Sequence, residues 1–416
     1  MPCEDASDRL RSEIAAEIGA RGPIPFARFM EMCLYHPVLG YYTRGIGGGG
    51  GRDYLTSSGT HSAFGLLLAR QVDEMWRRAG RPDPYHFVEF GPGEGYFALD
   101  FLREAARSEG FAKALRYVMV EPSPVLAERQ RSRLAGRSAS AVQWLSEQDL
   151  DRRAKFAGCL FANEVLDAFP VHRVMGTPQG PREIHVDAGA GGLHEILAPL
   201  SSDSVGCFLH DNGIVLEDGQ EIDLNLAAPC WVSWAAGLLQ RGYLMIVDYG
   251  YEAPELYAPQ RRRGTLLAYH RHRIGEDFLE RPGEQDLTAH LDFTAIRRAA
   301  ESAGARQLGL TTQARFLLGL GALELIQVPE APLAGGDDQP AGRFLEALKD
   351  REALKELILP GRMGDRFRVQ VLGVGDVPRD LAGLSRPWDR PEVTAAASPL
   401  SPPRGAALAR ESEDQP

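Results

Sequence analysis

Hydrophobic residues near the start of the chain recur at helical spacing. Over residues 8–36 the apolar positions fall three or four residues apart, and GPIP at 22–25 interrupts the run. Because glycine and proline end helices, this pattern predicts two helices separated by a tight break. The stretch that follows, residues 40–58 with consecutive glycines at Gly47–Gly51, predicts a loop that is either a mobile flap or an exposed linker.

From residue 85 onward the pattern alternates between short apolar runs and helical segments. The apolar runs are YHFVEF, RYVMVE, AVQWL and CLFANEVL, and the helical segments among them include FALDFLREAAR and VLAERQRSRL. Short buried strands that alternate with helices indicate βαβ units and a parallel sheet. The sequence therefore predicts an open α/β fold.

The pattern changes between residues 171 and 228, where short alternating runs are separated by Gly, Pro and Asp. This is typical of antiparallel strands, which we expect as an insertion in the sheet domain. GYLMIVDYGY at 242–251 then resumes the buried-strand pattern. We expect three parts: a helical segment with the glycine-rich flap at 1–60, an α/β domain with the insertion at 61–377, and a disordered, proline-rich tail at 378–416.

Composition and charge exclude several classes of protein. The net charge of −11 argues against a broad nucleic-acid footprint, since such proteins concentrate positive charge. The five cysteines form no C-x-x-C pair, which argues against a zinc ribbon or a disulfide framework and indicates a reducing compartment. The chain shows neither a signal-peptide pattern nor an apolar run of the roughly 20 residues that a membrane helix needs. We expect a cytoplasmic protein without membrane insertion and without a nucleic-acid partner.

EFGPGEG at 89–95 places three glycines at alternate positions after an apolar run. The dinucleotide fingerprint needs a glycine where Tyr96 stands, and the Gly-Lys-Ser/Thr of a P-loop is absent. The spacing suits an adenosylmethionine site, where backbone amides after the first strand face the cofactor. Glu121, at the end of the next strand, would accept hydrogen bonds from the ribose, and Glu89 would orient the loop or meet the cofactor's ammonium. Other nucleotide binders and a plain tight turn remain open.

Seven segments of the chain together form a recognisable set. They are PIPFARFMEMCLYHPVLGYYT at 23–43, VEFGPGEG at 88–95, FANEVLDAFPVHRV at 161–174, LMIVDYGY at 244–251, GTLLAYHRHR at 264–273, PGEQDLTAHLDFTAI at 282–296 and PGRMGDRFRV at 360–369. In this order they resemble the MidA-like methyltransferases, the family that includes the mitochondrial arginine methyltransferase acting in respiratory complex I assembly. The patterns ANE-x-x-DA-F-P and GEQDLTAH-x-DF are specific to that family, whereas the glycine loop alone is not.

The resemblance implies a class I methyltransferase fold, Rossmann-like, with a mixed sheet, helices on both faces and an inserted antiparallel region. It also implies an N-terminal helical segment that closes over the cofactor. The reaction implied is methyl transfer from S-adenosyl-L-methionine, which leaves S-adenosyl-L-homocysteine. The cofactor-binding residues implied are Thr56, Ser57, Glu89, Gly91, Pro92, Gly93, Gly95, Glu121 and Asn163.

The sequence departs from the family pattern in two places. After GPG the family usually has Arg and then Gly-Thr, where this chain has Glu94, Gly95 and Tyr96. The T-S-P-E pattern of the flap appears as T-S-S-G at 56–59. Because the flap loses its acid, we do not expect that loop to keep an unaltered role in substrate binding.

Three polar residues, Asn163, Glu164 and Asp167, follow a buried strand at the edge where open α/β folds bind ligands. Methyl transfer from a sulfonium is an in-line displacement, so the protein mainly positions the acceptor and provides for the proton it loses. Paired carboxylates hold a guanidinium through bidentate hydrogen bonds, which fits arginine as the acceptor. The alternative that Glu164 or Asp167 caps the following helix stays open.

The histidines of YHRHR at 269–273 are further candidates. Strand alternation would place His270 and His272 on one face, and no third ligand with metal spacing accompanies them. We therefore expect no metal site. His270 joins the catalytic candidates as a base or pocket residue, with packing and surface roles as the alternatives.

The function predicted is that of a methyltransferase that uses S-adenosylmethionine and methylates a protein arginine. Two alternatives remain: a small-molecule O- or N-methyltransferase, suggested by the altered flap and Tyr96, and a non-catalytic assembly factor that binds a protein partner. The partner expected is accordingly a protein substrate or a small-molecule acceptor. The inserted strands have two interpretations, a surface for a protein partner and a homodimer interface.

Overall fold

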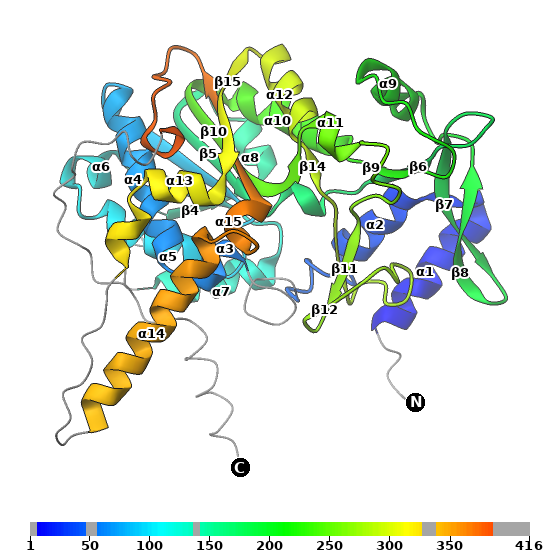
Figure 1. Ribbon diagram of the computed structural model, residues 1–416, viewed down its shortest axis with the longest axis horizontal. Helices are drawn as coiled ribbons and strands as arrows, with labels where there is room; N and C mark the ends of the chain where they lie inside the picture. The colour runs from blue at the N-terminus through cyan, green and yellow to red at the C-terminus, as the bar shows by residue number, and fades with distance from the viewer. Residues whose placement is uncertain (1–5, 47–55, 136–141, 327–337, 386–416) are drawn as a thin grey trace.

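An eight-stranded sheet is the largest element of the computed structural model, which describes residues 6–46, 56–135, 142–326 and 338–385 (Figure 1). Its strand order is β15-β16-β10-β5-β2-β3-β4, and β14 also pairs with β10. The strands are β2 Tyr85–Phe90, β3 Leu115–Val120, β4 Val142–Leu145, β5 Phe156–Asn163, β10 Leu239–Tyr251, β14 Leu291–Asp292, β15 Ala305–Thr312 and β16 Phe367–Val374. Strands β4, β3, β2, β5 and β10 run parallel, whereas β16 pairs antiparallel with both β10 and β15. The α/β fold with a mixed sheet is confirmed.

Helices cover both faces of this sheet because its central strands are apolar on both sides. Phe87, Tyr117 and Phe161 point to one face, where they form a core with helices α4, α5, α13 and α14. Val88, Val118 and Leu160 point to the other face, under α10 and α12. The bounds are α4 Ala63–Arg78, α5 Tyr96–Ala105, α10 Ala227–Leu238, α12 Phe293–Ser302, α13 Gln313–Gly319 and α14 Asp338–Ile358.

Short elements connect these layers, and several lie at the edge where the parallel strands end. They are α3 Ser57–Thr60, α6 Glu109–Ala114, α7 Pro124–Leu134, α8 Glu147–Asp151, α11 Ala253–Leu256, α15 Met363–Arg366, and the 3-10 turns η2 Leu166–Ala168, η3 Ala322–Leu325 and η4 Ala382–Leu384. Helix α7 follows β3, and η2 follows β5. Both are therefore beside the carboxyl edge of the sheet, where ligands of open α/β folds bind.

The two helices expected at the N-terminus are α1 (Ala6–Arg21) and α2 (Phe26–Tyr35), separated by β1 (Ile24–Pro25). In Figure 1 they lie beside the smaller sheets, away from the main one. Their apolar faces share a core with Val171, with Val186 of the small sheet that contains β1, and with Leu287 of the other small sheet. The expected glycine segment Gly47–Gly51 lies outside the described residues.

The predicted insertion at 171–228 does contain antiparallel strands, but it also contains a helix that the pattern did not indicate. The strands β6 His172–Met175, β7 Arg182–Gly189, β8 Gly192–Ala198 and β9 Glu221–Leu224 form one small sheet with β1, and α9 spans Asp203–Asp211. Helix α9 buries only Val205 and Leu209, so it has too few apolar positions to show helical spacing in the sequence. A second small sheet contains β11 Leu267–His270, β12 Arg273–Gly275 and β13 Asp286–Thr288.

The start of the predicted disordered tail needs correction. Residues 378–385 continue the fold, with Leu381 fully buried and Gly383 packed against the ring of Phe316. Their backbone is also paired, since Gly383 N donates to Gln71 Oε1 at 2.8 Å. Composition alone misplaced the boundary because a few buried residues suffice to hold a proline-containing segment. Residues 386–416 lie outside the described part.

Candidate active site

A cavity of about 970 Å³ opens at the carboxyl ends of the parallel strands. Residues that directly follow β2, β3, β4 and β5 line it, together with aromatic residues of α10 and tyrosines from the N-terminal segment. Each strand end contributes a different chemical group, as in other ligand sites of open α/β folds. In the order of the strands just named, the lining residues are Gly91–Glu94, Glu121 with Pro122, Leu145–Gln148 and Asn163–Val165.

The glycine loop after β2 adopts a backbone that only glycine adopts without strain. Gly91, Gly93 and Gly95 have φ angles of +58°, +52° and +79°. A Cβ on Gly91 would lie 2.8 Å from Cγ2 of Val165. Gly91 and Gly93 line the cavity, whereas Gly95 caps α5 and is not part of the lining. The loop thus brings backbone without side chains to the cavity wall. Gly95, which we expected to contact the cofactor, instead shapes the turn that leads into α5.

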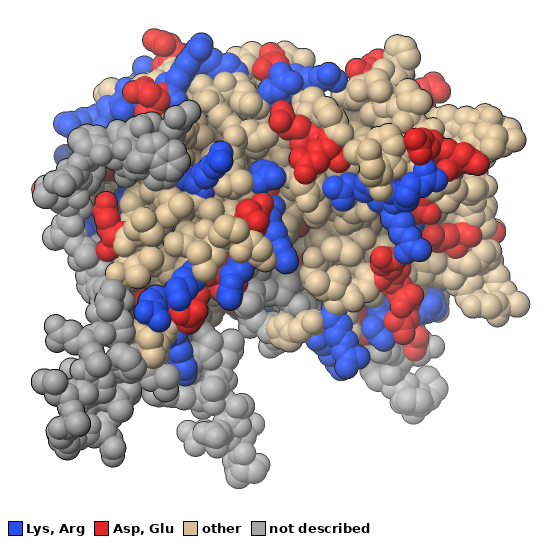
Figure 2. Space-filling view, viewed as in Figure 1, with Lys and Arg blue, Asp and Glu red and all other residues tan. Residues whose placement is uncertain are grey.

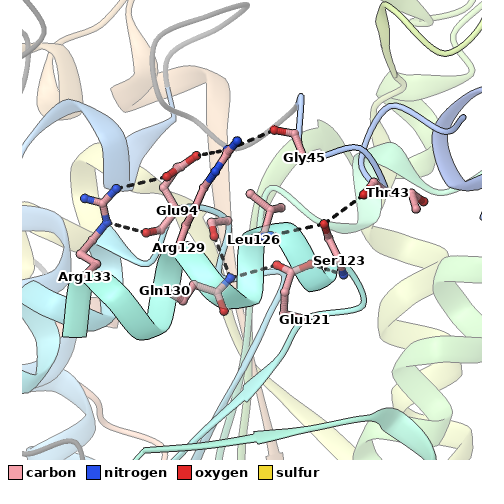
Figure 3. Close-up of polar contacts among 10 residues, drawn as sticks. Thr43, Gly45, Glu94, Glu121, Ser123, Leu126, Arg129, Gln130 and Arg133 are labelled. Carbon is pink, nitrogen blue, oxygen red and sulfur yellow. Dashed lines mark hydrogen bonds and ion pairs between the residues drawn. The ribbon is translucent and has the colours of Figure 1, made fainter. Parts of the chain in front are cut away.

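Helix α7, which contributes Leu126, Ala127 and Arg131 to the cavity wall, also holds the loop in place (Figure 3). The side-chain amide of Gln130 donates to the Gly93 carbonyl at 2.7 Å and to Oε2 of Glu121 at 3.1 Å. A further bond joins this region to the N-terminal segment, since Ser123 Oγ donates to the Thr43 carbonyl at 3.2 Å. One amide therefore fixes the glycine loop and the acid of the next strand relative to each other.

The same helix accounts for the first departure from the family pattern. Glu94 pairs with Arg129 at 2.8 Å and with Arg133 at 3.1 Å (Figure 3). The guanidinium of Arg133 also lies over the ring of Tyr96, 3.8 Å from its centroid. A glutamate in place of the family's arginine is thus matched by two arginines one helix away. These contacts tie the loop to α7.

Glu121 and Glu89 both line the cavity, but with different surroundings. Glu121 accepts from Ser123 N at 2.8 Å, and burial raises the pKa of its carboxyl to about 7. Glu89 lies deeper, 4% exposed, and accepts from the hydroxyl of Tyr117 at 2.6 Å. Burial raises the pKa of Glu89 to about 8. Hydrogen-bond donors of a ligand, such as ribose hydroxyls or an ammonium, would favour the charged form of each carboxylate.

The flap residues separate into two roles. Thr56 and Ser58 line the cavity, and Thr56 also caps α3 by accepting from Gly59 N at 2.9 Å. Ser57, which we expected to contact the cofactor, is fully buried and is not part of the lining. Its hydroxyl donates to Gln313 instead, at 2.8 Å. Adjacent residues at the start of a helix point in different directions, and the middle one here points away from the cavity.

An aromatic wall on one side of the cavity was missed by the sequence analysis. Trp231 and Trp234 of α10 line it together with Phe169 and Trp144. Trp231 also packs edge-on against Phe90 with ring centroids 4.9 Å apart. Such rings offer a flat apolar surface of the kind on which a purine ring stacks. The spacing of the two tryptophans indicates one helical face, but only the fold shows that this face borders the cavity.

Glu164 has the most constrained position at the site. Its φ angle is +54°, uncommon for a non-glycine residue, and its N–H donates to the Val247 carbonyl of β10 at 2.9 Å. Its Oε1 accepts from Ser57 N at 3.0 Å and from the Asn163 amide at 3.1 Å. Within the described residues Oε2 has no hydrogen-bond donor, and Glu164 lines the cavity. Burial raises the pKa of this carboxyl to about 8.

The alternative that an acid caps the turn after β5 holds in part for Asp167, whose carboxyl accepts from the backbone of Asp167 and Ala168. Asp248 of β10 caps the same turn, because its Oδ2 accepts from Leu166 N at 3.1 Å and from Asp167 N at 3.3 Å. Asp167 lies 5% exposed beneath the cavity and does not line it. The sequence analysis did not identify Asp248 as a candidate, because the pattern of its segment, LMIVDYGY, predicts only a buried strand.

Buried acids therefore gather around Glu164 at one end of the cavity. Burial raises the pKa values of Asp167 and Asp248, and the charges of Glu164, Asp167, Asp248 and Asp286 oppose one another. In the described part of the chain, no arginine or lysine forms an ion pair with Glu164, Asp167 or Asp248. A cluster of this kind favours a cationic ligand, whose charge would stabilise the ionised forms.

Two tyrosines of the N-terminal segment close the same end. Tyr35 donates to the Ala168 carbonyl at 3.0 Å, and Tyr42 donates to Oδ1 of Asp286 at 2.8 Å. Their rings stack with centroids 5.7 Å apart, and both line the cavity. Sequence reasoning gave these tyrosines no role, because nothing local in the sequence connects them to residues more than a hundred positions away.

His270 does not join the other catalytic candidates. It is not part of the cavity lining, and its Nδ1 lies 2.9 Å from the Glu284 carbonyl. Tyr269, its neighbour on β11, takes the side near Asp167 and Asp286, so alternation turns His270 to the opposite face. The expected alternation of His270 with His272 is also wrong, since Arg271 and His272 have positive φ angles in a hairpin turn. In the described ranges no group of three potential ligands suits a metal ion.

Comparisons with known proteins agree with this site. Residues 67–311 match the family described as putative S-adenosyl-L-methionine-dependent methyltransferases. A likely methyl transferase from Burkholderia thailandensis, solved with bound S-adenosyl-homocysteine, is 33% identical with a TM-score of 0.80 and covers 93% of this chain and 97% of its own.

Two curated relatives extend the comparison. The mitochondrial protein arginine methyltransferase NDUFAF7 of Danio rerio is 28% identical over 381 residues, covering 85% of this chain and 84% of its own. That of Homo sapiens is 27% identical over 401 residues, covering 88% and 83%. Both similarities extend well beyond the residues that surround the cavity.

Proposed function

Because this chain belongs to that family of S-adenosylmethionine-dependent methyltransferases, we propose that it transfers the methyl group to a guanidinium nitrogen of an arginine in a protein substrate. The curated relatives from zebrafish and human, which are named protein arginine methyltransferases, support this choice of acceptor. The observation that carries it is the buried acid cluster, with Glu164 at the cavity surface.

The cavity has the features that adenosylmethionine requires. Bare backbone at Gly91 and Gly93 would admit the amino-acid part, Glu121 would accept hydrogen bonds from the ribose, and Glu89 would pair with the ammonium. Thr56 and Asn163 also line this cavity. Adenosylmethionine supplies an electrophilic methyl group on its sulfonium, and the protein's part is to hold the acceptor in line with it.

Glu164 is the residue that holds the acceptor in this proposal. Its Oε1 already accepts two hydrogen bonds, so Oε2 is the oxygen available to accept a hydrogen bond from a ligand in the cavity. A guanidinium donates to that oxygen through one nitrogen and keeps another free to attack. The guanidinium loses one proton as its free nitrogen is methylated, and Glu164 takes that proton from the nitrogen it binds, which leaves the lone pair on the attacking nitrogen. A carboxyl whose pKa is raised to about 8 is a better base for this step than an exposed glutamate.

The turnover of such a site should depend on pH in a specific way. Glu164 has its pKa raised to about 8 by burial, while the guanidinium stays protonated throughout the accessible range. The productive pair needs ionised Glu164, so kcat/KM for the acceptor should rise by about tenfold per pH unit below pH 8 and level off above it. Initial rates of label transfer between pH 6 and 10 measure this. A rate that climbs steadily to pH 10 would instead indicate an amine acceptor.

Three finer points belong to the same proposal. We take the protein to act in the cytoplasm, because the cysteines at 33, 159, 207 and 230 are free thiols. We propose no nucleic-acid partner, since on the face in Figure 2 basic side chains lie in small groups among acidic ones. No helix in the described ranges is long and apolar enough to cross a membrane. A homodimer through the inserted sheet stays a proposal.

The experiment that tests the proposed acceptor is incubation with methyl-labelled adenosylmethionine and a lysate of the source organism, followed by separation of proteins from small molecules. We expect label in a discrete protein band. Label in small molecules only would favour the second candidate, for which the altered flap at 56–59 is the specific observation. Cofactor binding without transfer to any acceptor would favour a non-catalytic assembly role.

A further inference from the structure

The carboxylate of Glu164 is held by a backbone group that lies far away in the sequence. Ser57, the first residue of α3, donates its N–H to Oε1 at 3.0 Å across a separation of 107 positions. The Asn163 amide donates to the same oxygen at 3.1 Å. Two donors on one oxygen fix the rotation of the carboxylate, and that rotation decides where Oε2 points.

Ser57 is itself held in place by a buried glutamine. Its hydroxyl donates to Oε1 of Gln313 at 2.8 Å, and the Gln313 amide donates to the Leu357 carbonyl of α14 at 3.1 Å. Ser57 and Gln313 are both fully buried. A buried glutamine with both ends of its amide used has one orientation only, so the position of Ser57 is defined by α13 and α14.

A second bond secures the other end of α3. His61, which follows the helix, lies with Nε2 2.9 Å from Oδ1 of Asp350 on α14, and its Nδ1 accepts from Ala63 N at 3.0 Å. The His61 side chain is fully buried. Helix α3 is thus held at its first residue by Gln313 of α13 and just after its last residue by Asp350 of α14, although it is only four residues long.

Such support is needed because Glu164 stands among like charges. Asp167, Asp248 and Asp286 all disfavour its ionised form, and burial does so more strongly. The Ser57 N–H opposes these effects, and it is the stronger of the two hydrogen bonds that do. A carboxylate without this donor would be protonated more readily or would turn away from the acceptor.

We propose that Ser57, through its backbone N–H, and Gln313, through the Ser57 hydroxyl, are positioning residues that set the acceptor carboxylate of Glu164. This inference rests on the proposed function for the identity of the acceptor, but the hydrogen-bonded chain from Gln313 to Glu164 does not depend on it. Ser57 thereby changes from an expected cofactor contact to a support of the acceptor site.

The test is a comparison of Ser57→Pro with Ser57→Ala in the full chain saturated with S-adenosylhomocysteine or adenosylmethionine. Proline suits the first position of a helix, and Thr56 before it is already extended, with φ −96° and ψ 157°, as a residue preceding proline must be. Both variants lose the hydroxyl, but only proline removes the N–H. Their difference therefore reports the hydrogen bond to Glu164.

The first readout is the pKa of Glu164, followed by carbon NMR of glutamate carboxyls and assigned with Glu164→Gln. We expect it to be higher in Ser57→Pro than in Ser57→Ala by about one unit. The second readout is the rate of label transfer to lysate protein, expected to be about tenfold lower in Ser57→Pro. The affinity for S-adenosylhomocysteine should be the same in both.

Gln313→Met offers an independent variant if proline disturbs the fold. It removes the same hydrogen bond as Ser57→Ala, so each should lower the rate by about two- to tenfold, and the double variant should be no worse than either single one. Additive effects, or equal Glu164 pKa values and rates in Ser57→Pro and Ser57→Ala, would overturn the inference. If the wild type labels no protein, the proposed acceptor fails, while the pKa comparison still decides the positioning role.

Discussion

Glu164→Gln is expected to lower kcat/KM for the acceptor by about 100-fold, the largest loss of turnover from any conservative substitution at the site. Glutamine keeps an oxygen for Ser57 N and the Asn163 amide, but it places an NH2 group where Oε2 would receive the guanidinium. Removing one member of a buried, hydrogen-bonded charge pair costs about 2–5 kcal/mol. Steady-state rates of methyl transfer at saturating adenosylmethionine measure the effect.

Two controls separate this loss from damage to the fold. The affinity for S-adenosylhomocysteine should stay within about twofold of the wild type, because Glu164 is placed at the acceptor end. The melting temperature should not fall, since glutamine keeps the oxygen that Ser57 N and the Asn163 amide contact and carries no charge beside Asp167, Asp248 and Asp286. Full turnover and unchanged acceptor affinity in Glu164→Gln would mean that this carboxylate does not bind the acceptor.

Gly91→Val is expected to weaken binding of S-adenosylhomocysteine by 100-fold or more, on the order of a 3 kcal/mol loss. The backbone at Gly91 is left-handed, with φ +58°, and a Cβ there would lie 2.8 Å from Cγ2 of Val165. A β-branched side chain in this region is strained, and it would crowd Val165 at the cavity wall, where we propose that the cofactor binds. Titration calorimetry with S-adenosylhomocysteine measures the affinity.

The matched control is Gly80→Val. Gly80 also has a left-handed backbone, φ +84°, but nothing lies within 4 Å of its added Cβ, and it does not line the cavity. Gly80→Val should therefore destabilise the fold by a similar amount but leave the affinity for S-adenosylhomocysteine unchanged. Equal affinities in Gly91→Val and Gly80→Val would show that the loop after β2 does not contact the cofactor.

The parts of the fold that the sequence predicted depend on short-range patterns. Runs such as YHFVEF are apolar on both sides, which in a parallel sheet requires helices on both faces. Glu121 and Glu164 were located because each directly follows such a run, and the ends of parallel strands meet at one edge. A residue adjacent to a predicted strand end is thus placed by the topology itself.

The parts that escaped prediction depend on contacts between distant segments. Nothing near Gln313 indicates that it would hold Ser57, 256 positions earlier. The same is true of Tyr42 and Asp286, which are 244 positions apart. His270 was misjudged because the two-residue strand period was extended through a hairpin turn, where it does not apply. Distances in space, which local patterns do not encode, decide these roles.

The identity of the methylated residue is the most direct test of the central claim that the acid cluster binds an arginine side chain. Lysate protein labelled by the wild-type enzyme would be hydrolysed to amino acids, and the labelled species would be separated against methylated standards, with Glu164→Gln run in parallel. We predict label on a guanidinium nitrogen of arginine, and about 100-fold less of it with the variant. Label on lysine, on another side chain or only on small molecules would contradict the claim.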